Sequence, residues 1–101
     1  MPRLLDLGLD RIRNIITDMA RLSESSVFSA LEAYESESNA KKHIFEQSEK
    51  LRTLQDEVTD LAIELIARYQ PVATDLRFIK SCMEIAYGYS RFGRYSYDIV
   101  D

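Results

Sequence analysis

The chain has 101 residues, of which 46% are hydrophobic and 30% charged, with three glycines, two prolines and no tryptophan. This length and composition predict a single domain over residues 1–101 with a core of its own, and they exclude a disordered protein. The net charge is −4, from eight basic and 13 acidic side chains in residues 1–67 and five basic and four acidic ones in residues 68–101. That balance argues against nucleic-acid binding, which requires a strongly basic face.

The sequence also predicts a cytoplasmic protein with no direct membrane insertion. Cys82 is the only cysteine, so no disulfide forms within the chain, as is usual in a reducing compartment. Asp6, Asp10 and Arg11 interrupt the apolar N-terminal region, which therefore differs from a signal peptide. No apolar run approaches the roughly 18 residues that a membrane-spanning helix needs.

The first predicted helix runs from about Leu4 to Glu35. Its inward face is predicted by apolar and small residues that recur every three or four positions; they are Leu5, Leu9, Ile12, Ile16, Met19, Ser23, Val27, Ala30 and Tyr34. Four serines fall in its second half, at Ser23, Ser25, Ser26 and Ser29. No His–Asp pair accompanies them, so we interpret them as a weakly packed stretch and not as nucleophiles.

The second predicted helix runs from about Ala40 to Tyr69, after a polar connection that Asn39 is expected to end as a helix cap. Its seam steps alternately by three and four residues, as in a left-handed bundle; it is Ile44, Gln47, Leu51, Leu54, Val58, Leu61 and Leu65. A short connection makes the two helices antiparallel neighbours. His43 lies beside two lysines and is expected on the surface.

A proline corner separates the second helix from the third. Pro71 lacks a backbone N–H and disfavours helix at the preceding residue, so the second helix should end near Tyr69. Thr74 is expected to cap the third helix, with Asp75 in its first turn, where the helix dipole favours an anion. Phosphate binding at this helix start is a weaker alternative, because Asp75 would repel the anion.

The third predicted helix runs from about Asp75 to Val100. Its stripe is Ile79, Cys82, Ala86, Tyr89, Gly93, Ser96 and Val100, widened by Phe78, Met83, Ile85 and Phe92. Gly93 on this stripe indicates close packing against another helix, and Cys82 is expected in the core. With no strand alternation in the chain, the predicted fold is all-α, an elongated antiparallel three-helix bundle.

Two tyrosines and a basic group on the third helix are candidates for partner contacts. Tyr87 and Tyr95 fall off the inward line, so they lie either at the core edge or on a contact surface, where tyrosine is enriched. The basic residues of this region are Arg68, Arg77, Lys80, Arg91 and Arg94. They allow a local basic patch in an otherwise acidic chain.

The corner carries a family resemblance. Its residues Gln70-Pro71-x-Ala73-x-Asp75-Leu76-Arg77 closely resemble the signature of PhoU-type regulators of phosphate uptake, and the similarity covers about residues 4–101. It implies a PhoU-like bundle that is not an enzyme and that regulates phosphate uptake and phosphate-starvation signalling. The implied partners are the ATPase subunit of a membrane transporter and a sensor histidine kinase. The candidate partner-binding residues are Gln70, Asp75, Arg77, Tyr87, Arg91, Arg94 and Tyr95.

The chain departs from the family pattern where that family holds metal clusters. The third helix of the family usually reads Glu-Arg-Ile-Gly-Asp, and this chain has Ser90 and Arg94 at the acidic positions. On the second helix, the family acids correspond to Glu46, Ser48 and Arg52. A hard cation needs several carboxylate oxygens. We therefore expect the iron or zinc cluster to be absent or weakened, with no cofactor and Glu46 as the one remaining candidate ligand. Arg94 is expected to pair with Glu46 instead.

Other interpretations of the sequence stay open. Members of the family normally carry two such three-helix repeats, so the missing half is either a second copy, in a homodimer, or a part lost if the chain is a fragment. The chain is alternatively a regulatory domain for another ion transporter, a metal-binding helical protein or a structural dimerisation module.

Overall fold

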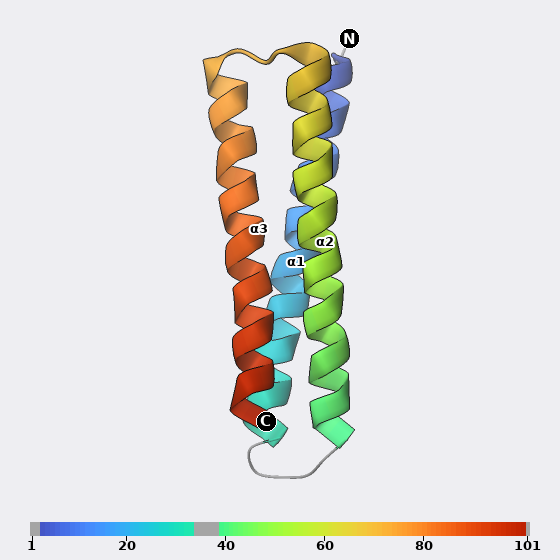
Figure 1. The fold of residues 1–101 in the computed structure, drawn as a ribbon, viewed down its shortest axis with the longest axis vertical. Coiled ribbons are helices and arrows are strands. Elements are labelled where there is room, and N and C mark those ends of the chain that lie inside the picture. Colours follow the sequence, from blue (N-terminus) through green and yellow to red (C-terminus); the bar gives the residue numbers. More distant parts are fainter. Residues whose placement is uncertain (1–2, 34–38, 101) are drawn as a thin grey trace.

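Three long helices lie side by side along their length (Figure 1). The computed structural model describes the backbone of residues 3–33 and 39–100 and the side chains of residues 3–31 and 42–98. The helices are α1 (Leu4–Ala33), α2 (Asn39–Tyr69) and α3 (Ala73–Val100). Because the described ranges contain only these helices, packed into a body of 51 × 21 × 17 Å, the predicted all-α three-helix bundle is confirmed.

The helix boundaries agree with the sequence except at the start of α3. The end of the first predicted helix at Glu35 and the capping side chain of Asn39 lie outside the described residues. The predicted cap at Thr74 is wrong, because α3 already begins at Ala73 and the Val72 carbonyl accepts a hydrogen bond from the Leu76 N–H at 2.9 Å. Val72 is therefore the capping position, and Asp75 still lies in the first turn.

The core follows the three predicted seams. Its fully buried members include Ile12 and Met19 of α1, Leu51 and Val58 of α2, and Ile79 of α3. Cys82 is buried as predicted, and desolvation raises the pKa of its thiol, which disfavours the thiolate form. No helix in the described ranges is long and apolar enough to cross a membrane.

Three positions predicted to face inward do not. Val27 is 38% exposed, and Ser26 occupies the inward position of that turn with no exposed surface. On α3, Ile85 and Phe92 are 45% and 53% exposed, whereas the residues that follow them, Ala86 and Gly93, are buried. Phe78 and Met83 are half-buried against the core, as predicted.

Gly93 packs closely against another helix, as the sequence predicts, and that helix is α2. A Cβ atom at this position would lie 2.6 Å from Cδ1 of Leu51 and 3.4 Å from Cα of Ser48. The first distance is far shorter than ordinary carbon–carbon contact, and Leu51 is fully buried. A larger residue at this position would therefore have to displace the buried side chain of Leu51.

Replacing Ser26 with alanine should raise the free energy of unfolding by about 1 kcal/mol. The buried hydroxyl of Ser26 has no hydrogen-bond partner among the described residues, and an unsatisfied buried polar group costs about 1–3 kcal/mol. Ser96→Ala is the matched control, since Ser96 is equally buried but its hydroxyl donates to the Phe92 carbonyl at 3.0 Å. Urea denaturation of both variants measures the difference, and equal effects at the two positions would contradict the assignment.

Candidate interaction surface and interhelical groove

The α2–α3 corner is built by a helix-ending motif that uses Gln70. This residue has φ +45°, in the left-handed region that glycine normally occupies at the end of a helix. Its N–H donates to the Ile66 carbonyl at 3.1 Å, and Pro71 follows it and prevents the helix from continuing. The geometry of the corner thus depends on the backbone conformation of Gln70. It does not depend on what the exposed side chain of Gln70 contacts.

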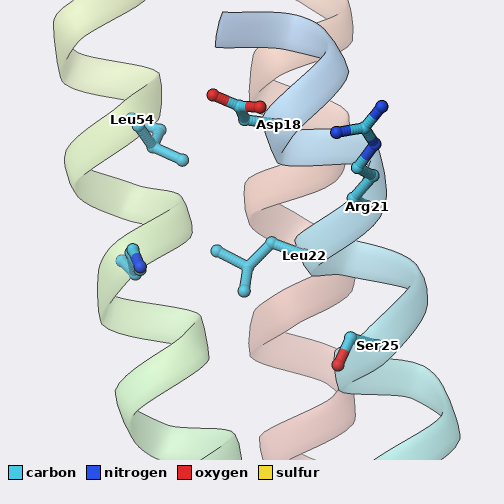
Figure 2. Close-up of a pocket in the computed structure, with 6 residues that line it drawn as sticks. Asp18, Arg21, Leu22, Ser25 and Leu54 are labelled. Atoms are coloured by element: carbon cyan, nitrogen blue, oxygen red, sulfur yellow. The ribbon is translucent and has the colours of Figure 1, made fainter.

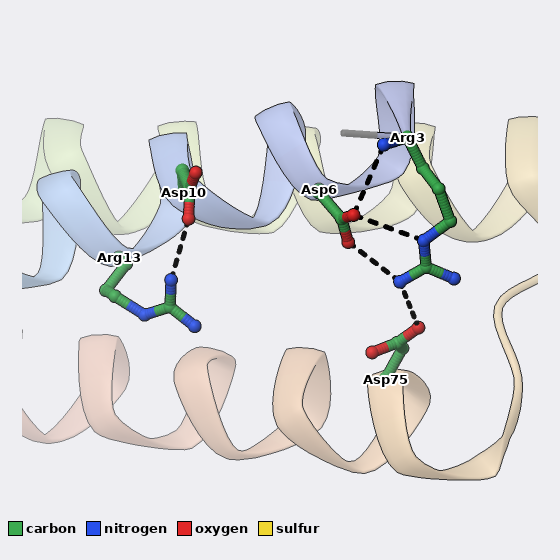
Figure 3. Close-up of polar contacts among 5 residues, drawn as sticks. All are labelled: Arg3, Asp6, Asp10, Arg13 and Asp75. Carbon is green, nitrogen blue, oxygen red and sulfur yellow. Dashed lines mark hydrogen bonds and ion pairs between the residues drawn. The ribbon is translucent and has the colours of Figure 1, made fainter. Parts of the chain in front are cut away.

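Asp75, at the start of α3, is held by a residue that the sequence analysis did not select. The Arg3 guanidinium bridges Oδ1 of Asp6 at 2.7 Å and Oδ2 of Asp75 at 3.1 Å (Figure 3). The hydrogen bonds from Arg3 lower the pKa of Asp6, and those to Asp6 and Asp75 raise the pKa of Arg3. This bridge ties α1 to α3 at the corner, so Asp75 has a structural role that accounts for its position.

The position of Arg3 follows from the topology. The corner reverses the chain once and the first connection reverses it once more, so the starts of α1 and α3 lie at the same end of the bundle (Figure 1). A basic residue near the N-terminus is then the nearest counter-charge for Asp75. The sequence contained both charged residues, but the pairing of Arg3 with Asp75 could be predicted only by working out that α1 and α3 begin at the same end of the bundle.

One exposed stripe runs along the outside of α3. We name it the outer stripe of α3; its members recur at steps of three or four residues and are all exposed, and they are Arg77, Lys80, Glu84, Tyr87, Arg91 and Tyr95. It contains four of the seven candidate partner-binding residues. Arg77 has no ion-pair or hydrogen-bond partner among the described residues. Arg68 lies elsewhere, on α2, where it pairs with Glu64 at 3.7 Å.

Two tyrosines and an arginine form an ordered cluster within the outer stripe of α3. The Arg91 guanidinium lies 5.7 Å from the ring centre of Tyr87 and 5.4 Å from that of Tyr95, within cation–π range. It also donates a hydrogen bond to the Tyr95 hydroxyl, which raises the pKa of Arg91. These contacts restrict side chains that remain about half exposed. The tyrosines therefore lie off the core line, as predicted.

A groove between α2 and α3 brings together side chains from both helices. We name it the α2–α3 groove; it has a volume of about 250 Å³ and is lined by Phe45, Ser48, Glu49, Arg52, Ser90, Arg94 and Tyr97. The rings of Phe45 and Tyr97 lie 5.4 Å apart and face the same space. Four of the five positions where the family resemblance implies acids, namely 48, 52, 90 and 94, thus converge here, whereas Glu46 does not line this groove.

The predicted pair between Glu46 and Arg94 is wrong. Among the described residues no ion pair joins them, because Glu46 lies on the side of α2 that faces α1, next to Leu22, His43 and Lys50. The carboxylate in the α2–α3 groove is that of Glu49, three residues further along α2. Sequence alone did not fix the rotation of α2, so it did not show which glutamate lines the α2–α3 groove.

The residues of the α2–α3 groove do not suit a divalent cation. Two guanidinium groups and two serine hydroxyls accompany a single carboxylate, whereas hard cations take several carboxylate or carbonyl oxygens. In the described part of the chain, no group of three or more histidine, cysteine or acidic residues is placed to hold a metal ion.

A second groove lies between α1 and α2. It has a volume of about 360 Å³, and Leu22 and Leu54 point into it from the two helices (Figure 2). Asp18, Arg21 and Lys50 surround these apolar side chains. Beside it, Nε2 of Gln47 donates to the Ser25 hydroxyl at 3.0 Å, while the buried Oε1 of Gln47 has no partner among the described residues. His43 is exposed near this groove, as predicted.

The described part of the chain is thus an elongated three-helix bundle with an exposed stripe of aromatic and basic side chains on α3. The PhoU domain family matches residues 16–101, and the chain belongs to this family. The searches of curated proteins and of solved structures each found no significant match. The family is regulatory and non-enzymatic, and its members generally interact with phosphate transport and signalling proteins. Its presence indicates a role in the regulation of phosphate transport.

Proposed function

We propose that this chain is a non-enzymatic adaptor that regulates phosphate uptake and phosphate-starvation signalling through protein–protein contacts in the cytoplasm. The observation that supports the proposal best is the outer stripe of α3 in a member of the PhoU family. The proposed partners are the ATPase subunit of a membrane transporter and a sensor histidine kinase. Binding of a rigid helix face shifts the partner between its conformations by differential affinity for them.

The chemistry of the outer stripe of α3 suits such a contact. Tyrosine and arginine are the residue types that dominate binding hot spots. Here both tyrosines are already held by Arg91, so little side-chain freedom is lost when a partner covers them. The stripe carries three basic residues against one acidic residue, which favours a partner with an acidic surface.

Replacing Tyr87 and Tyr95 together with serine should weaken capture of the transporter subunit by a factor of about 30 or more. This corresponds to the loss of one hot spot of about 2 kcal/mol. The measurement is a titration of the purified ATPase subunit onto immobilised protein. Phe28→Ser is the control, because Phe28 is an equally exposed aromatic residue on α1, outside the stripe. Equal loss in both variants would count against the outer stripe of α3.

We also propose that the chain forms a homodimer, which would supply the second three-helix repeat found in other members of the family. Exposed apolar side chains outside α3, including Leu4, Leu7 and Leu31 of α1, support a further buried surface. Light scattering should give twice the monomer mass. If Tyr87 and Tyr95 lie in that interface, their replacement lowers the mass toward that of the monomer.

A further inference from the structure

The α2–α3 groove holds two arginines without any carboxylate partner. Arg52 of α2 and Arg94 of α3 are exposed and line the same groove, and neither makes an ion pair, hydrogen bond or ring contact within the described part of the chain. Arg21 and Arg77 also lack a carboxylate partner among the described residues, but neither lines this groove. By contrast, Arg3, Arg11 and Arg13 all pair with acidic residues.

The hydroxyl of a largely buried serine in the same groove also has no partner among the described residues. Ser90 is only 5% exposed and lines the groove from α3, yet its hydroxyl makes no hydrogen bond with any described residue. A serine in a helix commonly bonds to the carbonyl one turn back, as Ser96 does to Phe92. The Ser90 hydroxyl is therefore available to a ligand in the groove, as is that of Ser48 on the facing helix.

We propose that the α2–α3 groove binds a small oxyanion of the phosphate class. Guanidinium groups donate pairs of parallel hydrogen bonds to phosphate oxygens, and two arginines on different helices approach a tetrahedral anion from different sides. The serine hydroxyls add neutral donors. The volume of about 250 Å³ accommodates the anion with several waters, each of which takes about 30 Å³ in the liquid.

The packing of α3 on α2 fixes the two helices that carry these donors. Gly93 lies between Ser90 and Arg94 in sequence and contacts Leu51, which is next to Arg52. The close crossing thus fixes the separation of the two helices beside the groove. Glu49 is the one carboxylate in the lining, and it leaves a net charge of +1 on the side chains around the site. This inference uses only the chemistry of the groove and does not depend on the proposed adaptor function.

The test is calorimetric titration of the purified chain with inorganic phosphate at constant ionic strength, which potassium chloride maintains. We expect one phosphate per chain. Arg52→Gln and Arg94→Gln should each weaken binding at least about tenfold, since hydrogen bonds between charged groups are among the strongest in proteins. Arg77→Gln is the matched control, because Arg77 is an unpaired, exposed arginine of α3 outside the groove, and it should leave binding within about twofold.

Further ligands identify the anion and its source. Sulfate should compete with phosphate, while acetate should not. O-phosphoserine binding more tightly than inorganic phosphate would support the site and assign it to an esterified phosphate. Amide resonances of Ser48, Ser90 and Gly93 should shift on titration, ahead of those near the corner. The proposal would be overturned by any of three results. The first is no binding at 10 mM phosphate, which is about the millimolar limit of useful affinity. The others are an equal weakening of phosphate binding by Arg77→Gln, and acetate binding as tightly as phosphate.

Discussion

Replacing Leu51 with alanine is expected to lower the free energy of unfolding by about 3 kcal/mol, within the range of about 2–5 kcal/mol for such truncations in a core. Leu51 is fully buried in the centre of the α2 seam and packs against the Gly93 backbone of α3. Its loss removes apolar contacts and leaves a cavity that two rigid helices cannot close. Chemical denaturation at fixed protein concentration measures the change.

The contact between Leu51 and Gly93 is tested by combining the two substitutions. Gly93→Ala alone should destabilise the chain by about 1 kcal/mol, because crowding against Leu51 outweighs the gain of about 1 kcal/mol in helix propensity. In the Leu51→Ala background, the added methyl group enters the cavity and the same change should stabilise. The expected coupling is about 2 kcal/mol, within the range for contacting residues.

Gly88→Ala provides the control within the same helix. No atom lies within 4 Å of a Cβ added at Gly88, so this change should stabilise the chain by up to about 1 kcal/mol in either background. If Gly93→Ala behaved like Gly88→Ala, α3 would not approach α2 as closely as the structure describes. A coupling energy near zero between Leu51 and Gly93 would lead to the same conclusion.

The seams were predictable because helical periodicity encodes them directly. Steps of three and four residues selected Leu51, Val58 and Ile79 correctly, and all three are fully buried. The errors in the predicted seams occur where a polar residue lies at an inward position or an apolar residue lies at an exposed one. The step of four residues after Ser23 predicted Val27 on the inward face, yet Ser26 occupies the inward position of that turn. Periodicity therefore predicted the helices and the residues in the middle of each buried face well. It predicted the residues at the edges of the buried faces less well.

The groove was not predictable, because it depends on how α2 and α3 are rotated and aligned against each other. A helix face advances by about 100° per residue, so a small rotation exchanges Glu49 for Glu46. Sequence reasoning selected Glu46 and paired it with Arg94, whereas Glu46 faces α1. The link between Arg3 and Asp75 was missed for a related reason, since 72 residues separate them. Tertiary alignment, and not propensity, determines these contacts.

Restoring acids to the α2–α3 groove is expected to create a cation site that the natural sequence does not suit. The variant carries Ser48→Asp, Arg52→Asp and Arg94→Asp, all at half-buried or exposed positions, so that with Glu49 four carboxylates line the groove. Without metal, their mutual repulsion should destabilise the bundle. Manganese, which prefers carboxylate oxygens, should reverse this effect.

The expected gain is about 2.7 kcal/mol in the free energy of unfolding at a manganese concentration 100-fold above the dissociation constant. Thermal denaturation with and without manganese measures it. The control carries Arg77→Asp and Lys80→Asp on the outer stripe of α3, where two new acids lie on one exposed face without a groove between helices. A large manganese effect confined to the groove variant means that positions 48, 52 and 94 converge as described. Since the same convergence places Arg52 and Arg94 around an anion in the natural chain, failure of the groove variant to respond would also remove the geometric basis for oxyanion binding.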